Sequence, residues 1–217
     1  MVNIEGVRHF IDGVLDDELA RQRWTRVLGR RLDDLSVYVI FERPAAVESL
    51  VAFCEDYIRL APDMLAQIHA CARASRTEPL FRPFLHTCVD YFIHPTLSVL
   101  NQVGPDGLLV RAYQCHRLIE ELYDGNLSLR NSRLCNLEAT QANLLAHALI
   151  GEPFANELDA ATELAMRKLV RQPDYHFLDL ARYLEQARSE HWAALTRRWQ
   201  HLLSQHGMVF RFSLGME

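Results

Sequence analysis

The sequence lacks the features that mark a membrane or secreted protein. No apolar run approaches the roughly 18–20 residues that a membrane-spanning helix needs. The N-terminal segment MVNIEGVRHFIDGVLDDEL carries acids within its apolar periodicity and no basic leader, so it does not predict a signal peptide. The five cysteines are dispersed without a C-x-x-C pair, which is typical of reduced thiols. These absences predict a cytoplasmic protein with no membrane partner.

Short catalytic motifs are also missing. The chain has no G-x-G-x-x-G, P-loop, H-E-x-x-H or G-x-S-x-G, and no Glu-x-x-His of the kind that carboxylate-bridged di-iron bundles use. Basic residues are not in excess, because the net charge is −5, and this argues against a general nucleic-acid binder. The densest basic stretch, 21–26 (RQRWTR), includes Trp24, and RNA contact there is a minor hypothesis. Flanking acidic residues favour a solvated helix face instead.

Helical periodicity is what the sequence has in abundance. Its 217 residues, 49% hydrophobic and 24% charged, are enough to bury a sizeable core. We predict helices at 3–14, 16–32, 44–61, 62–75, 79–94, 96–102, 106–124, 137–150, 154–171 and 177–205. Pro62 and Pro105 suit a first helical turn, whereas Gly125 and Gly151 follow apolar runs as helix C-caps do. Since no linker interrupts the pattern, we expect residues 1–217 to form a single all-α domain, a multi-helix bundle.

Two short segments have a different composition. Residues 36–41 and 208–214 are rich in β-branched and aromatic side chains, which favour strands. Together they predict a minor two-stranded β element that ties the C-terminus to the N-terminal third. The alternative is that residues 36–41 extend a helix.

The strongest candidate site lies on the predicted helix 106–124. His116 and Glu120 are four residues apart on its apolar side, and Tyr113 precedes His116 by one turn. A buried ionisable group is costly unless it is paired, hydrogen-bonded or bound to a metal. We therefore predict an acid–base or binding site at His116, Glu120 and Tyr113. The alternative is a buried His–Glu hydrogen bond that only fixes packing.

A metal is one species that could satisfy this pair. Imidazole and carboxylate groups bind divalent metals such as Fe or Zn, and His191, at a core-type position of the predicted helix 177–205, could supply a third ligand beside His116 and Glu120. Weaker candidate ligands are His86, Asp90, His94 and His147. The first three follow one stripe of the helix 79–94. They extend over about 12 Å, too far for one ion, so a solvent-facing edge is the competing interpretation.

Two functional hypotheses follow. In the first, a polar His/Glu pocket inside the bundle binds a metal ion or a small molecule, and the metal form would be a metal-dependent oxidoreductase. In the second, the protein is a non-catalytic homodimer with structural histidines, and Trp24, Trp192 or Trp199 anchors the interface. The length, the helical pattern and the long last helix are loosely similar to the haem-oxygenase-like and thiaminase-II-like architecture. No motif of that group is matched, so the resemblance assigns no functional residue.

Overall fold

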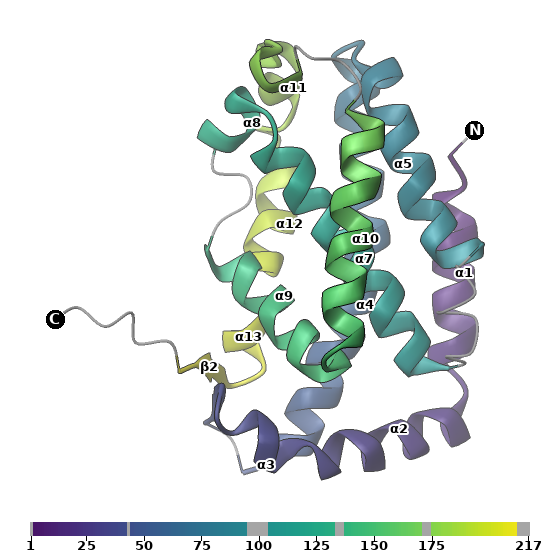
Figure 1. Cartoon of the computed structure of the whole chain (residues 1–217), viewed down its shortest axis with the longest axis vertical. Coiled ribbons are helices and arrows are strands. Elements are labelled where there is room, and N and C mark those ends of the chain that lie inside the picture. Colours follow the sequence, from purple (N-terminus) through teal and green to yellow (C-terminus); the bar gives the residue numbers. More distant parts are fainter. Residues whose placement is uncertain (1, 43, 95–103, 133–136, 171–174, 212–217) are drawn as a thin grey trace, which may run out of the picture.

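The protein is mostly helical, and its helices pack as one bundle beside a small two-stranded antiparallel sheet (Figure 1). The computed structural model describes residues 2–42, 44–94, 104–132, 137–170 and 175–211, with the backbone alone at 137–140. The prediction of an all-α bundle with a minor β element is confirmed. The predicted helix 96–102 lies outside the described residues.

The helices and strands of the described residues follow one another along the chain as α1 (Ile4–Leu15), α2 (Glu18–Arg30), α3 (Leu32–Leu35), β1 (Val39–Phe41), α4 (Ala46–Ala74), α5 (Glu78–Ile93), α7 (Pro105–Asp124), α8 (Leu127–Asn131), α9 (Leu137–Ile150), α10 (Phe154–Leu169), η1 (Tyr175–Phe177), α11 (Ala181–Gln186), α12 (Glu190–Gln200), α13 (Leu202–Gln205) and β2 (Met208–Phe210). Figure 1 shows α2 and α3 across one end of the bundle and α8 and α11 at the other.

The first helices begin at residues that cap them. The Asn3 side chain accepts a hydrogen bond from the Gly6 amide, and Asp17 accepts from the first amides of α2. Helix α1 then buries one stripe at a spacing of three and four residues, made of Ile4, Val7, Ile11 and Leu15. Each such side chain contributes about 1.5–3 kcal/mol when fully buried, so this stripe holds α1 against α4 and α5.

Helix α4 is continuous through Pro62, and the predicted break at this residue is wrong. Proline has no N–H, so the carbonyl of Ile58 receives no helical hydrogen bond from residue 62. Ile58, Ala61, Pro62 and Leu65 are all buried, and their packing on both sides of the proline holds the helix together. The proline therefore leaves a locally weakened hydrogen-bond ladder in the middle of a long core helix.

Helix α7 lies in the centre of the bundle, where it packs against α4, α5, α9 and α10 (Figure 1). Gly104, at φ +96°, turns the chain into Pro105, which occupies the first turn as predicted. The helix is buried on nearly every side, including the polar residues Arg111 and Gln114. The helix is therefore buried more completely than the single apolar side seen in its sequence predicts.

The predicted long helix 177–205 is also wrong, because the structure divides it into α11, α12 and α13. Ser189 explains one of these divisions, because it is the N-cap of α12. Its hydroxyl accepts a hydrogen bond from the Trp192 amide at 3.2 Å, and a new helix begins there. After α13, Gly207 adopts a left-handed conformation with φ +67° and turns the chain into β2. Strand β2 pairs with β1 in antiparallel register, with Ile40 opposite Val209.

Asn126 connects α8 to the segment that precedes α11. Its side-chain oxygen caps α8 by accepting from the Leu129 amide at 3.0 Å. Its amide group donates to the carbonyls of Tyr175 at 2.6 Å and Leu178 at 3.0 Å. The residue is fully buried, so none of these bonds can be replaced by water without rearrangement.

We expect Asn126→Ala to lower the free energy of unfolding by about 2–4 kcal/mol, because it removes the cap, leaves the part-buried Leu178 carbonyl without a donor and leaves the Tyr175 carbonyl with the Leu178 amide alone. Denaturant titration followed by far-UV circular dichroism measures the change. Asn131→Ala, at an exposed position of the same helix, is the control and should stay within about 0.5 kcal/mol of the wild type. Equal effects of the two substitutions would contradict this role.

Candidate functional site

His116 is completely buried and is held between two aromatic rings. Its Nε2 donates to the Tyr57 carbonyl at 3.0 Å, and its ring centroid lies 4.5 Å from that of Tyr57 and 5.4 Å from that of Trp199. Burial lowers the pKa of His116 to about 4, even though the Tyr57 carbonyl favours the charged form. The imidazole is therefore neutral at pH 7, with its proton on Nε2 and a lone pair on Nδ1.

Glu120 lies one turn further along α7 and is almost completely buried. Burial raises the pKa of its carboxyl group, and the nearby Arg117 guanidinium opposes that rise. Arg117 donates to Oε2 of Glu120 and, through Nε, to Oδ1 of Asp159 at 3.2 Å. Although burial alone would lower it, these carboxylates raise the pKa of Arg117 above its ordinary value. The buried carboxylate is thus paired with a cation from its own helix.

Asn143 brings α9 into the same region. The Tyr57 hydroxyl donates to Oδ1 of Asn143 at 2.6 Å, so Tyr57 contacts both His116 and Asn143. The Asn143 amide lies near enough to Glu120 to lower the pKa of that carboxyl group. However, neither Asn143 Nδ2 nor Glu120 Oε1 has a partner that meets hydrogen-bond distance and angle.

A second group of polar side chains leads from this region towards the surface. The Tyr113 hydroxyl donates to Oδ1 of Asp159 at 2.6 Å. Nε2 of His147 lies 3.0 Å from Asn156 Oδ1 and 3.6 Å from Asp159 Oδ2. The side chains of Arg117, His147 and Asp159 are 25%, 21% and 33% exposed, so this seam between α7, α9 and α10 reaches solvent.

We call the inner group the interior polar site and define it by Tyr57, His116, Glu120, Asn143 and Trp199. Within the described part of the chain, four of its buried atoms have no hydrogen-bond partner: His116 Nδ1, Glu120 Oε1, Asn143 Nδ2 and Trp199 Nε1. Leaving a buried polar group unsatisfied costs about 1–3 kcal/mol. These four atoms lie on α7, α9 and α12, while Trp24 Nε1, Trp192 Nε1 and Arg111 Nε are buried without a partner elsewhere in the described core.

The structure does not bring His191 to this site. His191 occupies the first turn of α12, where it is exposed, while Trp199 two turns later contacts His116. Among the residues that the structure describes, no group of three His, Cys, Asp or Glu side chains could hold a metal ion. The three-ligand grouping of His116, Glu120 and His191 is therefore not assembled, because Ser189 restarts the helix and places His191 at its open end.

The other candidate ligands have separate environments. On α5, Asp90 and His94 are exposed and contact each other, with Oδ1 and Nδ1 3.2 Å apart, and His86 is half-buried. This stripe faces solvent rather than a cavity. His147, in contrast, belongs to the seam beside Tyr113.

All three tryptophans are buried, with at most 2% of each residue exposed. The prediction that Trp24, Trp192 or Trp199 anchors a dimer is therefore wrong, because each ring fills the core of its own chain. Trp24 is also inaccessible to a nucleic-acid base, while Arg23, Arg26 and Arg30 lie exposed on α2. The arginine-rich stretch is a solvated face, where Arg21 forms an ion pair with Glu55 at 2.6 Å.

Sequence reasoning missed the partners that come from distant helices. Tyr57 and Asp159 lie in segments where nothing in the local pattern distinguishes them, and Arg117 falls on the opposite side of the helical wheel from His116. The only signal was indirect: Trp199 follows the same apolar stripe as Leu195. A long arginine side chain can bend back along its helix, which a wheel does not represent.

Comparisons with protein-family models, with curated proteins and with solved structures find no match to this chain. The long last helix on which the haem-oxygenase-like resemblance depended is divided, so the fold gives no independent support for it. No helix among the described residues has the length and apolarity that crossing a membrane requires.

The lowered pKa of His116 makes stability depend on pH. The unfolded chain, with a pKa near 6.5, binds a proton more readily than the native state, so stability is full above pH 6.5 and is lost as pH falls towards 4. Between pH 7 and pH 4 we expect His116 to remove about 3 kcal/mol from the free energy of unfolding.

His116→Gln keeps a donor for the Tyr57 carbonyl but cannot titrate. Chemical denaturation at several pH values should show the difference between wild type and this variant shrinking by that amount on acidification. His201→Gln, at an exposed position, should keep the wild-type pH dependence. A difference that stays constant from pH 7 to pH 4 would show that His116 titrates normally.

Proposed function

We propose that the protein binds a small, neutral, polar molecule inside the helical bundle, at the interior polar site. The observation that carries this proposal is the set of unpartnered buried atoms on His116, Glu120, Asn143 and Trp199. A fully structural cluster would be expected to satisfy its own hydrogen bonds. The seam of half-exposed side chains at Arg117, Asp159 and His147 offers a polar route to it.

The unpartnered atoms specify the chemistry of the ligand. His116 Nδ1 carries a lone pair and accepts from a hydroxyl or N–H group, whereas Trp199 Nε1 and Asn143 Nδ2 donate to an acceptor. Glu120 is paired with Arg117, so the site has no excess positive charge with which to hold an anion. A molecule with a hydroxyl or amide group matches this set of donors and acceptors.

Binding fits the electrostatics better than acid–base catalysis. A general base works best with a pKa near the working pH, and a pKa of about 4 leaves His116 a weak base. Burial, with the bond to Asp159 second, raises the pKa of Tyr113 well above its ordinary value, so Tyr113 stays protonated as a donor. The proposed roles of His116, Glu120 and Tyr113 are to hold and orient the ligand. A metal-dependent oxidoreductase would need ligands beyond His116 and Glu120.

Native mass spectrometry of the purified chain, together with thermal unfolding in a panel of small alcohols, polyols and amides, tests this proposal. We expect a co-purified molecule or a stabilising compound of this class in the wild type. Glu120→Gln and His116→Gln should fold but weaken its binding tenfold or more, which is a loss of about 1.4 kcal/mol or more. Glu157→Gln, at an exposed position of α10, is the matched control and should bind normally.

Two results would contradict the proposal. No bound molecule and no stabilising compound, combined with strong destabilisation by both substitutions, would assign the cluster a purely structural role. A stoichiometric metal that disappears in His116→Ala and Glu120→Ala would instead restore the metal hypothesis.

A homodimer is the second candidate, and the two-stranded sheet is the observation that favours it. Val37, Tyr38, Ile40 and Val209 are 67%, 47%, 44% and 43% exposed around β1 and β2. Exposed apolar side chains on a short sheet with open edges are a typical site of association. In this dimer, the exposed side chains of the sheet, rather than the tryptophans, would anchor the interface.

For this candidate we expect light scattering after gel filtration to show a dimer that Ile40→Lys or Val209→Lys converts to a monomer, since each places a charge in the apolar contact. Leu164→Lys, at an exposed leucine of α10, is the control and should leave the dimer intact. A wild-type protein that is monomeric over the whole concentration range would eliminate this candidate.

A further inference from the structure

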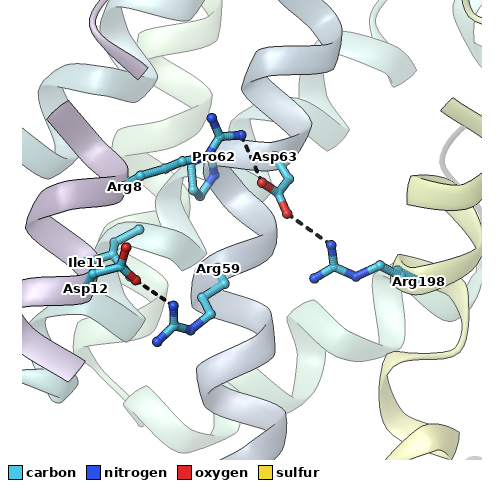
Figure 2. A pocket seen from close by; sticks show the side chains of 7 residues that line it. All are labelled: Arg8, Ile11, Asp12, Arg59, Pro62, Asp63 and Arg198. Atoms are coloured by element: carbon cyan, nitrogen blue, oxygen red, sulfur yellow. Dashed lines mark hydrogen bonds and ion pairs between the residues drawn. The ribbon is translucent and has the colours of Figure 1, made fainter. Parts of the chain in front are cut away.

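A groove on the surface between α1, α4 and α12 collects arginines from all three helices. Figure 2 shows Arg8 from α1 and Arg198 from α12 reaching Asp63 on α4 from opposite sides. The nitrogen–oxygen distances are 2.9 Å for Arg8 and 3.0 Å for Arg198. Arg59, one turn before Asp63, reaches Asp12 on α1 at 2.5 Å. We call this region the arginine groove.

The arginine groove consists of two adjoining hollows. One has a volume of about 200 Å³ and the other about 260 Å³, and both are bordered by Arg8, Asp63 and Arg198. Ile11 and Pro62 form an apolar wall of the first hollow, and Leu195 forms one in the second. Ligand pockets usually combine such apolar walls with a few convergent polar groups.

Two of the arginines retain unused hydrogen-bond donors. A guanidinium group has five N–H donors in a planar fork. Among bonds between described residues, Arg59 uses one donor on Asp12, and Arg198 uses one on Asp63. Their side chains are 42% and 47% exposed, so the remaining donors are accessible to a ligand.

The carboxylates balance the charge of the arginine groove but do not use all of its donors. Arg8 pairs with Glu5 at 2.5 Å as well as with Asp63, so the three guanidinium groups meet the carboxylates of Glu5, Asp12 and Asp63. An anion would therefore be held by directed hydrogen bonds from the free N–H groups rather than by excess charge. Asp63 also holds Arg8 and Arg198 in place from opposite sides, and this reduces the entropy that a ligand must pay to order them. His191, which lines the second hollow, adds a further donor.

We infer that the arginine groove binds a phosphate monoester that has an apolar body. The phosphate carries between one and two negative charges at neutral pH and three oxygens that match the arginine fork. Its oxygens would accept from the free N–H groups of Arg59 and Arg198, which both border the first hollow. The apolar body would lie against Ile11 and Pro62 in the same hollow. This site is separate from the interior polar site, and its test does not depend on that site.

Isothermal titration calorimetry at low ionic strength, with phenyl phosphate as the probe, tests this inference. We expect saturable binding of phenyl phosphate, weaker binding of inorganic phosphate, and none of phenol, which has the ring but no charge. Arg59→Gln and Arg198→Gln should each reduce the affinity for phenyl phosphate about tenfold. Arg197→Gln removes the same charge from an exposed position beside Arg198 and should have little effect.

Circular dichroism and thermal unfolding confirm that the three variants are folded before binding is measured. Absence of saturable phenyl phosphate binding to the wild type would overturn the inference. So would equal losses in Arg197→Gln and Arg198→Gln, because the attraction would then come from overall charge rather than from the arginine groove. Equal affinity for phenyl phosphate and inorganic phosphate would show that the apolar wall of the groove does not contribute to binding.

Discussion

The burial of α7 on nearly all of its sides is the constraint on which the rest of the structure depends. A helix that carries Arg111, His116, Arg117 and Glu120 cannot occupy the centre of a bundle unless other helices satisfy these groups. Three of them find partners on other helices, and Glu120 is paired with Arg117 on α7 itself. Arg111 donates to the Phe92 carbonyl on α5, His116 donates to the Tyr57 carbonyl on α4, and Arg117 contacts Asp159 on α10. The polar residues of α7 therefore fix its position relative to its neighbours more specifically than apolar packing alone.

Two effects reduce the free-energy cost of burying these ionisable groups. Where a group can become neutral, it does so, as His116 does through its lowered pKa. Where a cation stays charged, it is balanced within reach, as Arg117 is by Glu120 and Asp159. Breaking one partner of such a buried pair costs more than the pair contributes, because it leaves an uncompensated charge.

Much of this fold follows from local patterns that the sequence displays directly. The amphipathic stripe of α1, the Pro105 start of α7 and the β-branched segments at 36–41 and 208–214 all predict elements that form, although the strands are shorter, at Val39–Phe41 and Met208–Phe210. Errors arose where a local signal competes with tertiary packing. At Pro62 the packing of the core overrides a helix breaker, whereas at Ser189 a single cap outweighs the continuing apolar stripe. That second error placed His191 in the interior, although it lies at an exposed helix start.

Only the α7 residues of the candidate site could be predicted from the sequence. His116 and Glu120 share a helix, so their spacing and apolar surroundings identify them without a structure. Tyr57, Asn143 and Trp199 come from three other helices, and which faces meet depends on the packing of the whole bundle. No pattern within a single segment contains that information. The same limit explains why the arginine groove has no local signature, since Arg8, Arg59 and Arg198 are brought together only by the fold.

The two proposed sites differ in a way that would sort ligands by charge. In the interior, His116 is neutral and Arg117 is fully engaged by carboxylates, so an anion entering there would lose its hydration without gaining a free cation. At the arginine groove, solvent still reaches guanidinium N–H groups that the carboxylates leave free, so an anion would exchange water for directed hydrogen bonds. Both sites take residues from the same two helices. Tyr57 and Asp63 lie on α4, and Trp199 and Arg198 are neighbours on α12. The backbone of these helices separates a neutral interior from a surface with free guanidinium donors, and each proposed site would suit a ligand that the other would exclude.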